Sequence, residues 1–487
     1  MLTRRIALGA VGCVMADALL GSCGGSSNVA PSSAAATAGS PPANPQPAPS
    51  GPQTVATVSV SASERGSIGA GFAGLSYEKN SMALPRFAPG NTDLIGLFRR
   101  LGPSLLRIGG NSVDETQWAA SGAGRTSGQV APSDIDALAG FLRATGWTVL
   151  YGVNLATSTA AAAAAEVAYA VQSLGTSLYA IEIGNEPDLY GGKYFPSWSV
   201  TDFEQRWGQF RSAILQVTPD VKLTGPAAAG NISSWTVPFG EHVGSGEIIL
   251  LTQHYYRGNG QSASSTVAEL VSPDPHLIGD LVTLAAGAAA IGVPFRIAET
   301  NSFYNGGANG VSDSYASSLW VIDDLFNIAQ GGGIGANMHG GGDGDGYTPI
   351  ADSDGVVVEA RPEYYGLLLF TLAGQGTLLT TSVVAGTLNV SAYALRTPAG
   401  GLSVVVVNKD STQNLQLSVD TGLSVNSAAL LVMTGPALDA TSGVAIQGAA
   451  VAPDGSFAPA AAYTARIAAS VVDCYVPALS AVLIRVS

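Results

Sequence analysis

The sequence has 487 residues, 46% of them hydrophobic and 11% charged, so it is long enough for one large globular domain and a smaller one. Its formal net charge of −14 argues against nucleic-acid binding, which needs clustered lysine and arginine, and makes a highly sulfated polymer a less suitable partner. Of the three cysteines only Cys474 lies outside the N-terminal leader, which excludes a disulfide framework, and no CxxC pair or dense His/Cys cluster indicates a zinc site.

Residues 1–23 are typical of an export signal. Arg4 and Arg5 precede an apolar run, and the segment Leu20-Gly21-Ser22-Cys23 resembles a lipobox, which implies cleavage before Cys23 and a lipid on its thiol. Asp17 weakens this interpretation, and the alternative is ordinary secretory cleavage without a lipid. We therefore expect a periplasmic or cell-surface lipoprotein, or alternatively a secreted protein. The lipid would be its only membrane attachment, because no later apolar stretch is long enough to span a membrane.

The next segments predict a linker, one strand and then a long α/β domain. Residues 24–54 are rich in Ser, Ala, Pro and Gly and predict a disordered linker. The alternation in residues 55–68 predicts a strand that joins a C-terminal β domain. In residues 69–373 apolar strand candidates alternate with helix candidates, the pattern of a (β/α)8 TIM barrel. The strand candidates are Gly71–Tyr77, Ser104–Gly109, Thr148–Asn154, Ala180–Gly184, Lys222–Pro226, Ile248–His254, Pro294–Ala298 and Gly335–His339. The helix candidates include Pro132–Thr145, Ala160–Leu174, Thr201–Val217, Leu277–Ile291 and Ser314–Gln330.

In residues 374–487 the sequence pattern changes: short runs rich in Val, Leu, Ser and Thr alternate with turns rich in Gly, Pro, Asn and Asp. This pattern predicts a C-terminal antiparallel β-sandwich. The predicted strands are Leu402–Asn408, Leu415–Val419, Ala428–Thr434 and Ser480–Arg485.

Two glutamates directly follow apolar strand candidates of the predicted barrel. Glu186 comes after the run that ends at Gly184, and Glu299 comes after the run that ends at Ala298. Active sites of such barrels lie where the strands end, so the two carboxyl groups should face one cleft. A pair of this kind is the minimum machinery for glycoside hydrolysis, with one acid held protonated and one carboxylate ionised. Glu182 competes for the acid role, but it lies deeper along its strand.

Five motifs in chain order resemble glycoside hydrolase family 79, the β-glucuronidases and heparanases, over roughly residues 70–370. The motifs are Gly74-Leu75-Ser76-Tyr77-Glu78, Arg107-Ile108-Gly109-Gly110-Asn111, Ile183-Gly184-Asn185-Glu186-Pro187-Asp188, Gln253-His254-Tyr255-Tyr256 and Ala298-Glu299-Thr300-Asn301. The Asn-Glu-Pro motif alone specifies only the larger clan of retaining glycosidases. The ordered set, followed by a glycine-rich loop and Tyr347, narrows the resemblance to the family. Around residues 340–346 the match is loose.

The resemblance implies a role for each matching residue. Glu186 would be the general acid/base and Glu299 the nucleophile of a retaining β-glucuronidase. Asn185 would hydrogen-bond the sugar 2-OH, and Glu78 and Asn111 would bind ring hydroxyls. Tyr256, or as the less favoured alternative Tyr255, would contact and orient Glu299. The glucuronate carboxylate would be held by Tyr347 and by the backbone N–H groups of Gly306 and Gly307, with Tyr304 lining the same loop. Neutral donors in a glycine-rich turn can bind a carboxylate without a cationic clamp.

Structural interpretations compete with several of these roles. Glu78 could instead form an ion pair with an arginine such as Arg107, and the Arg107–Gly110 motif could serve only strand-to-loop geometry. His254 and His339 are interpreted as hydrogen-bonded cleft residues. Asp343, Asp345, Asp352 and Asp354 form no complete calcium pattern and are interpreted as a solvated loop. The sequence therefore predicts neither a metal nor a cofactor.

The leading hypothesis is an exo-acting enzyme that removes β-linked glucuronic acid from a glycan or glycoside through a covalent intermediate. The alternatives are an endo-acting heparanase-like enzyme, a neutral-sugar glycosidase of the same clan, and a non-catalytic carbohydrate-binding lipoprotein. Retention of both carboxylates argues against the last of these.

Overall fold

The computed structural model describes residues 44–342, 344 and 346–487. The predicted export signal and the proposed lipid attachment at Cys23 lie outside these residues, and so do Asp343 and Asp345. None of the described helices combines the length and the apolar character needed to cross a membrane. The described residues form one compact unit.

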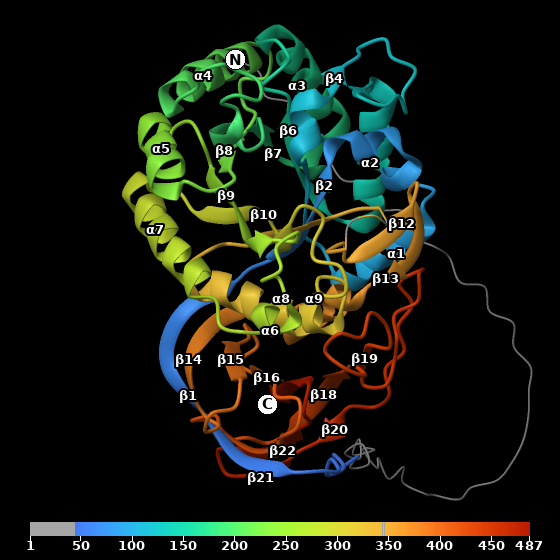
Figure 1. The fold of residues 1–487 in the computed structure, drawn as a ribbon, viewed down its shortest axis with the longest axis vertical. Helices are drawn as coiled ribbons and strands as arrows, with labels where there is room; N and C mark the ends of the chain where they lie inside the picture. The colour runs from blue at the N-terminus through green and yellow to red at the C-terminus, as the bar shows by residue number, and fades with distance from the viewer. Residues whose placement is uncertain (1–43, 343, 345) are drawn as a thin grey trace, which may run out of the picture. The chain divides into compact units, whose positions relative to one another are not determined.

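Eight parallel strands close into a barrel, in the order β10-β11-β2-β3-β6-β7-β8-β9 (Figure 1). Their bounds are β2 (Ala73–Glu78), β3 (Leu105–Gly109), β6 (Thr148–Val153), β7 (Leu178–Ile183), β8 (Leu223–Ala228), β9 (Leu250–Asn259), β10 (Phe295–Tyr304) and β11 (Ala336–Gly340). The apolar runs form strands because a barrel strand is covered by helices outside and by other side chains inside, so both of its faces are buried. The predicted barrel is confirmed, and each strand candidate overlaps one of these strands.

Helices surround the barrel (Figure 1). They are α1 (Thr92–Leu101), α2 (Pro132–Thr145), α3 (Ala160–Leu174), α4 (Val200–Val217), α5 (Val237–Val243), α6 (Val267–Leu270), α7 (Pro275–Ile291), α8 (Tyr315–Gln330) and α9 (Pro362–Ala373). Local signals set several ends: Ser199 and Asp202 form a capping box at the start of α4, and Gly146 ends α2 in the left-handed conformation. Short elements in the loops are η1 (Lys79–Ala83), η2 (Pro85–Phe87), η3 (Asn111–Glu115), η4 (Gly175–Ser177), η5 (Pro187–Leu189), a π-helical turn η6 (Ile232–Thr236), and the strand pairs β4 (Gln117–Trp118) with β5 (Gln129–Val130) and β12 (Ile350–Ser353) with β13 (Val356–Ala360).

The C-terminal β domain is an eleven-stranded sheet with the order β19-β18-β23-β16-β15-β14-β1-β17-β22-β21, and β20 pairs with β18. The strands are β1 (Gln53–Ile68), β14 (Gly376–Val384), β15 (Val390–Arg396), β16 (Leu402–Asn408), β17 (Asn414–Asp420), β18 (Ala428–Thr434), β19 (Ala445–Ile446), β20 (Tyr463–Thr464), β21 (Arg466–Ala468), β22 (Val471–Val476) and β23 (Ser480–Val486). The predicted antiparallel domain is thus confirmed. It is one continuous sheet that curls over its own core, since β22 near one end contacts β16 and β23.

Strand β1 pairs antiparallel with β14 and parallel with β17, so the segment before the barrel completes the C-terminal sheet. The preceding residues correct the predicted extent of the linker. Gln46 donates to the carbonyl of Tyr475 and accepts from its N–H, both at 2.8 Å. Residues 44–52 therefore lie along this domain: β21 pairs with β22 only at residues 471–473, so the Gln46 amide can satisfy the backbone groups of Tyr475 beyond that pairing.

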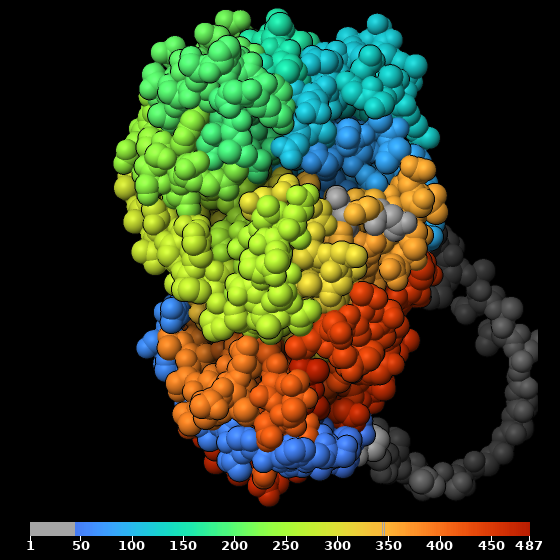
Figure 2. Space-filling view, viewed as in Figure 1, coloured from blue at the N-terminus to red at the C-terminus, as the bar shows by residue number. Residues whose placement is uncertain are grey.

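Helix α8 joins the barrel to the sheet. The ring of Phe326 stacks on Tyr393 at a centroid distance of 4.4 Å, and Tyr315 donates to the carbonyl of Leu479 at 2.8 Å. Asp323 accepts hydrogen bonds from Tyr393 and Lys409. In the space-filling view the orange and red atoms of the sheet lie directly against the yellow and green atoms of the barrel (Figure 2). One buried cluster accordingly contains side chains of both parts.

Candidate active site

A cavity of about 460 Å³ opens where the barrel strands end. It is lined by Glu78, Asn111, Glu186, Leu189, Ala229, Tyr256, Glu299, Tyr304, Asn305, His339 and Tyr347. The structure therefore brings together seven of the residues selected from the sequence, which lie on different strands and loops of the barrel.

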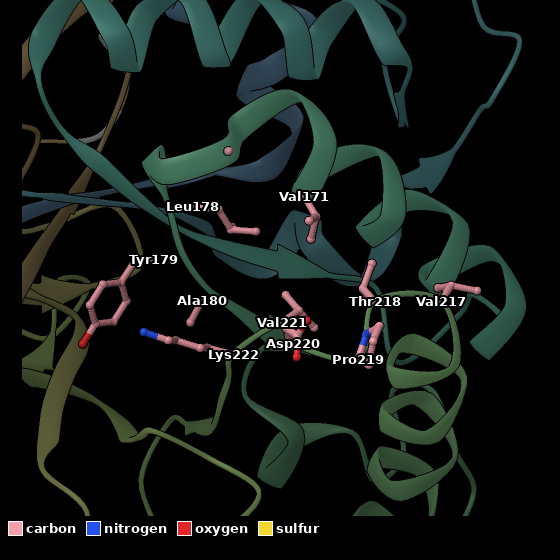
Figure 3. Close-up of a pocket in the computed structure, with 11 residues that line it drawn as sticks. Val171, Leu178, Tyr179, Ala180, Val217, Thr218, Pro219, Asp220, Val221 and Lys222 are labelled. Carbon is pink, nitrogen blue, oxygen red and sulfur yellow. The ribbon is translucent and has the colours of Figure 1, made fainter. Parts of the chain in front are cut away.

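A second cavity, of about 430 Å³, lies at the opposite end of the barrel, where β7 and β8 begin (Figure 3). Its walls are largely apolar, with Val171, Leu178 and Val221 among them. Asp220 supplies the one carboxylate among its lining residues, and Lys222 the one amine. A site that needs two opposed carboxyl groups is therefore built only by the first of these two cavities.

Glu186 is presented by a tight turn after β7. Gly184 has a φ of +89°, and a Cβ there would lie 2.8 Å from the hydroxyl of Tyr190, so glycine suits this position on both counts. Glu186 itself has a φ of 49°, and its N–H donates to the carbonyl of Ala227 at 2.8 Å. Its Oε1 lies 3.0 Å from Nδ1 of His254, and its side chain is 16% exposed. The turn thus displays this carboxyl group in the cavity.

Glu299 lies on β10 with hydrogen bonds to both of its oxygens. Arg107 donates from Nη1 to Oε2 at 2.7 Å, and Tyr256 donates to Oε1 at 2.8 Å. Burial alone raises the pKa of Glu299, but the charges of His339, His254 and Arg107 and the Tyr256 hydrogen bond outweigh it and hold that pKa well below its usual range. Burial, followed by the charge of Glu299, raises the pKa of Tyr256, so its hydroxyl stays protonated and donates. Glu299 is therefore an ionised carboxylate at neutral pH.

The two carboxyl groups are close neighbours. One oxygen of Glu186, one of Glu299 and a ring nitrogen of His254 all lie within 4.8 Å of one another. These residue types can bind a metal, but both Glu299 oxygens already accept hydrogen bonds, one of them from the Arg107 guanidinium. A cation placed here would be repelled by that guanidinium, so the donor set is better suited to proton transfer and nucleophilic attack.

Arg107 is the residue that the sequence interpretation underrated. From the middle of β3 its guanidinium donates to Glu182 at 2.6 Å, to Glu299 at 2.7 Å and to Oδ1 of Asn185 at 2.8 Å. Burial lowers the pKa of Arg107, yet the two carboxylates outweigh this and raise it above its usual value. Glu182, the competing acid candidate, is fully buried against this guanidinium, away from the cavity. An arginine inside a buried strand was the available signal, since such a charge requires paired carboxylates.

Glu78 and Asn111 lie at one side of the cavity. Glu78 accepts from the backbone N–H of Asn111 at 3.1 Å and of Ser112 at 2.7 Å, and its Oε1 lies 3.6 Å from Nε2 of His339. The alternative ion pair between Glu78 and Arg107 is therefore wrong, because Arg107 is occupied by other carboxylates. Burial raises the pKa of Glu78, but the hydrogen bond and charge of His339 outweigh this and lower it.

His339 lies between the two carboxylates Glu78 and Glu299, with Nδ1 3.6 Å from Glu299 and 3.0 Å from the hydroxyl of Ser76. Burial lowers the pKa of His339, but the charge of Glu299 and the interactions with Glu78 raise it to about 9. Its imidazole is therefore protonated at neutral pH. His339 lines the cavity, as expected of a hydrogen-bonded cleft residue, whereas His254 contacts Glu186 but is buried and is not among the lining residues.

The predicted carboxylate loop lies beside Tyr256. The ring of Tyr256 has the rings of Tyr304 and Tyr347 at centroid distances of 6.3 and 6.1 Å. Gly306 and Gly307 have φ values of +81° and +85°, and the carbonyl of Gly306 accepts from the N–H of Gly346 at 2.7 Å. These two glycines adjoin Tyr347 but are not among the residues that line the cavity.

Two further sequence interpretations have structural outcomes. Asn185 is buried and is not among the residues that line the cavity, and its amide oxygen accepts from Arg107 at 2.8 Å. Asp352 contradicts the predicted solvated loop, because it is buried and accepts from Nε and Nη2 of Arg86 at 2.8 and 2.7 Å. A buried guanidinium takes a planar bidentate partner, which explains the placement of this aspartate.

Comparisons with known proteins agree with this architecture. No family model matches the chain. Two curated relatives called β-glucuronidase are similar to parts of it: one from Aspergillus niger is 25% identical over 209 residues, and one from Neurospora crassa is 28% identical over 220 residues. These matches cover 38% and 39% of the relatives' own lengths, and the same shares of this chain.

Solved structures match over much more of the chain. A 4-O-α-L-rhamnosyl-β-D-glucuronidase from Fusarium oxysporum covers 88% of this chain with a TM-score of 0.75 and 20% identity, over 99% of its own length. An arabinofuranosidase from Xanthomonas axonopodis pv. citri covers 89% with a TM-score of 0.65 and 14% identity, over 100% of its own length. At these identities the likeness shows the fold alone: a closed eight-stranded barrel with an attached β domain.

Proposed function

We propose that the chain is a retaining β-glucuronidase that removes terminal β-linked glucuronic acid. The observation that carries this proposal is the pair Glu186 and Glu299, whose carboxylate oxygens come within 4.8 Å of each other and whose environments differ. Retaining enzymes hold their carboxyl groups about 5–5.5 Å apart, whereas inverting enzymes leave about 6.5–9.5 Å for a water molecule. The curated relatives called β-glucuronidase support the choice of sugar.

The geometry supports a division of labour. Glu299, ionised by its neighbours, attacks the anomeric carbon, and Glu186 protonates the departing glycosidic oxygen. Glu186 then accepts a proton from water, which attacks the same carbon and releases the sugar with its β configuration. The amide oxygen of Asn185 is held by Arg107 at 2.8 Å, which leaves the amide nitrogen to donate to the sugar 2-OH. Tyr256 keeps the Glu299 carboxylate oriented.

The sugar's own carboxylate is assigned to the Tyr304–Tyr347 side of the cavity. The hydroxyl of Tyr347 and the N–H groups of Gly306 and Gly307 are the proposed donors, and positive φ values at both glycines permit this loop geometry. Glu78 and Asn111 can bind ring hydroxyls, and so can His339, whose ring lies 6.0 Å from that of Tyr347. Because Glu78 is an ionised acceptor, it suits hydroxyl groups and would repel a carboxylate.

A panel of 4-nitrophenyl glycosides tests the proposal, with the β-glucuronide compared with the β-glucoside, the β-galactoside and the α-arabinofuranoside. We expect the β-glucuronide to have the highest kcat/KM. Preference for the arabinofuranoside or the glucoside would assign the site to a neutral sugar. Proton NMR of early product should show the β-anomer, and initial release of the α-anomer would contradict retention.

A further inference from the structure

The wall beside Glu186 must contact the leaving group, because the proposed acid protonates the glycosidic oxygen on that side. Two lining residues belong to this wall: Leu189, three residues after Glu186, and Ala229, whose N–H is held by Asp188. Both are apolar. Leu189 is 53% exposed and lines the cavity, so it leaves apolar surface there that a ligand can cover.

Hydrogen bonds hold this wall in place. The N–H of Leu189 donates to the carbonyl of Glu186 at 2.9 Å, and Nε1 of Trp198 donates to the carbonyl of Pro187 at 2.8 Å. Asp188 accepts from the N–H groups of Ala229 at 2.9 Å and Gly230 at 3.1 Å. Leu189 and Ala229 thus form a preorganised apolar surface, so a leaving group that covers it meets little ordering cost.

The charges that line the cavity disfavour an anionic leaving group. Three glutamates line it, and the described lining residues include neither lysine nor arginine. The imidazolium of His339 is the one cation among them, and it lies between Glu78 and Glu299. A sulfate or a second carboxylate on the leaving group would therefore be desolvated near negative charge without a cationic partner.

We propose that this site selects a neutral, largely apolar leaving group, such as a phenol or another hydrophobic alcohol, and discriminates against sulfated or carboxylated ones. This inference rests on the proposed β-glucuronidase function, because it assigns the other half of the same substrate. It makes Leu189 a specificity-determining contact that acts on the leaving group and not on the sugar.

The test compares Leu189→Ser with Leu423→Ser, a control on the β domain whose leucine is also 53% exposed. The probes are 4-nitrophenyl β-glucuronide and β-glucuronyl fluoride, which carry the same sugar, but the fluoride has no aglycone to contact Leu189. We expect Leu189→Ser to lower the nitrophenyl-to-fluoride ratio of kcat/KM by about three- to tenfold, as loss of part of a leucine contact predicts. The Leu423→Ser control should keep the wild-type ratio.

A second arm uses an aryl β-glucuronide that carries a ring sulfonate. Wild-type enzyme should use it at least about tenfold less well than the unsubstituted aryl glucuronide at low salt, and Leu189→Lys should narrow that gap. The inference would be overturned if Leu189→Ser left the nitrophenyl-to-fluoride ratio of kcat/KM unchanged, or if the wild-type enzyme preferred the sulfonate substrate. In either case, hydrolysis of the fluoride would still support the β-glucuronidase function. A wild-type enzyme that cleaves neither glucuronide would overturn both.

Discussion

Two chemically identical side chains differ in the charges around them. Both oxygens of Glu299 accept hydrogen bonds, from Arg107 and Tyr256, whereas Glu186 has one close partner, Nδ1 of His254. The first environment stabilises a carboxylate strongly enough to override burial. Glu186 has this single contact and a side chain that is 16% exposed, a geometry that suits the proposed acid/base role.

Replacing the two glutamates should separate their roles. Glu299→Gln should lose turnover for every β-glucuronide, because glycosylation needs its carboxylate. Glu186→Ala should spare glycosylation for substrates with excellent leaving groups, because these need no acid. Azide should restore turnover in this variant by attacking the glycosyl-enzyme in place of water, and the product should be a β-glycosyl azide. The measurement that checks these two roles is kcat/KM of both variants on β-glucuronides with good and with poor leaving groups. Equal losses on good and poor leaving groups in the two variants would contradict the assignment.

Tyr347 tests the choice of sugar. Tyr347→Phe removes one charge-assisted hydrogen bond to the glucuronate carboxylate, worth roughly 1.5–3 kcal/mol. The kcat/KM for a β-glucuronide should fall by about one to two orders of magnitude, while a matched β-glucoside should lose much less. The ratio of the two substrates is the measurement, because general damage to the cleft lowers both. A constant ratio would show that Tyr347 does not contact the carboxylate.

His339 predicts a pH dependence of stability. Its pKa is raised from 6.5 to about 9 by Glu299 and Glu78 against the effect of burial. Below the pKa of His339 in the unfolded protein, its protonated imidazole contributes fully to the stability of the fold. This contribution is lost as the pH rises through the pKa of His339 in the folded protein. The free energy of unfolding should therefore fall between about pH 6.5 and 9. The contribution is on the order of 3 kcal/mol.

Chemical denaturation at pH 6, 7.5 and 9 measures this effect. His339→Gln should show a flatter dependence than the wild type across this range. His276→Gln is the matched control, because the His276 side chain is 80% exposed, and it should keep the wild-type slope. Identical slopes in His339→Gln and the wild type would refute the role of the imidazolium.

Asp114 connects three elements around the turn that carries Glu186. From η3 its carboxylate accepts from the N–H groups of Leu155 at 2.9 Å and Ala156 at 3.0 Å, which follow β6. It also accepts from the N–H of Asn185 at 3.2 Å and from the hydroxyl of Tyr190, which follow β7. The position of the Glu186 turn therefore depends on one buried acceptor.

Asp114→Asn should both destabilise the fold and misplace the acid. An amide can satisfy only part of these donors, so we expect a loss of roughly 1–3 kcal/mol of stability. Substrates with poor leaving groups should lose more kcat/KM than those with good ones, because they depend on the placement of Glu186. Asp134→Asn is the control: Asp134 is also buried and accepts from the N–H groups of Ala131 and Arg125, but it caps α2 outside the cavity. Equal leaving-group dependence in both variants would show a purely structural role for Asp114.

Sequence patterns predicted those elements whose periodicity reflects local burial. The apolar runs of the barrel were recovered as strands, and α2 and α3 were recovered with their bounds, since capping and turn residues mark their ends. Helices α1 and α9 were not among the predictions. Ten of the twelve residues of α9 are buried, because it packs against α8 and against the sheet, so the usual amphipathic pattern is absent.

Contacts between distant segments were the part that sequence could not supply. Seven of the candidate residues line one cavity, since parallel strands deliver their ends to one face of the barrel, whereas Asn185, Gly306 and Gly307 are not among the lining residues. The partners of Arg107 depend instead on which strands face each other across the barrel. The loop residues Leu189 and Ala229 carry no motif, and their exposure to the cavity follows from hydrogen bonds of Asp188 and Trp198.

At the scale of the whole molecule, the barrel and the sheet share buried surface. The main buried cluster contains barrel side chains together with Tyr393, Val405, Met433 and Leu483 of the sheet. A second cluster, which includes Leu430, lies within the sheet alone. Because the shared cluster couples the two parts, we expect them to unfold together, although each has its own strands.

Two probes can report on the parts separately. All six tryptophans lie between positions 118 and 320, within the barrel and its helices, and the buried thiol of Cys474 lies in the sheet. In a chain with Cys13 and Cys23 replaced by serine, tryptophan fluorescence follows the barrel and thiol reactivity follows the sheet. Coincident transitions in denaturant are the mark of one cooperative unit.

The variant Leu430→Ala tests whether the barrel and the sheet unfold together, because Leu430 is fully buried in the cluster confined to the sheet. The lost contacts and the cavity should cost about 2–5 kcal/mol. If the parts are coupled, both the fluorescence midpoint and the thiol midpoint should fall by the same amount, even though every tryptophan is in the barrel. Leu423→Ser, at an exposed position of the same domain, should move neither. A thiol transition that shifts while the fluorescence transition stays in place would show that the sheet unfolds independently and that the shared cluster does not couple it to the barrel.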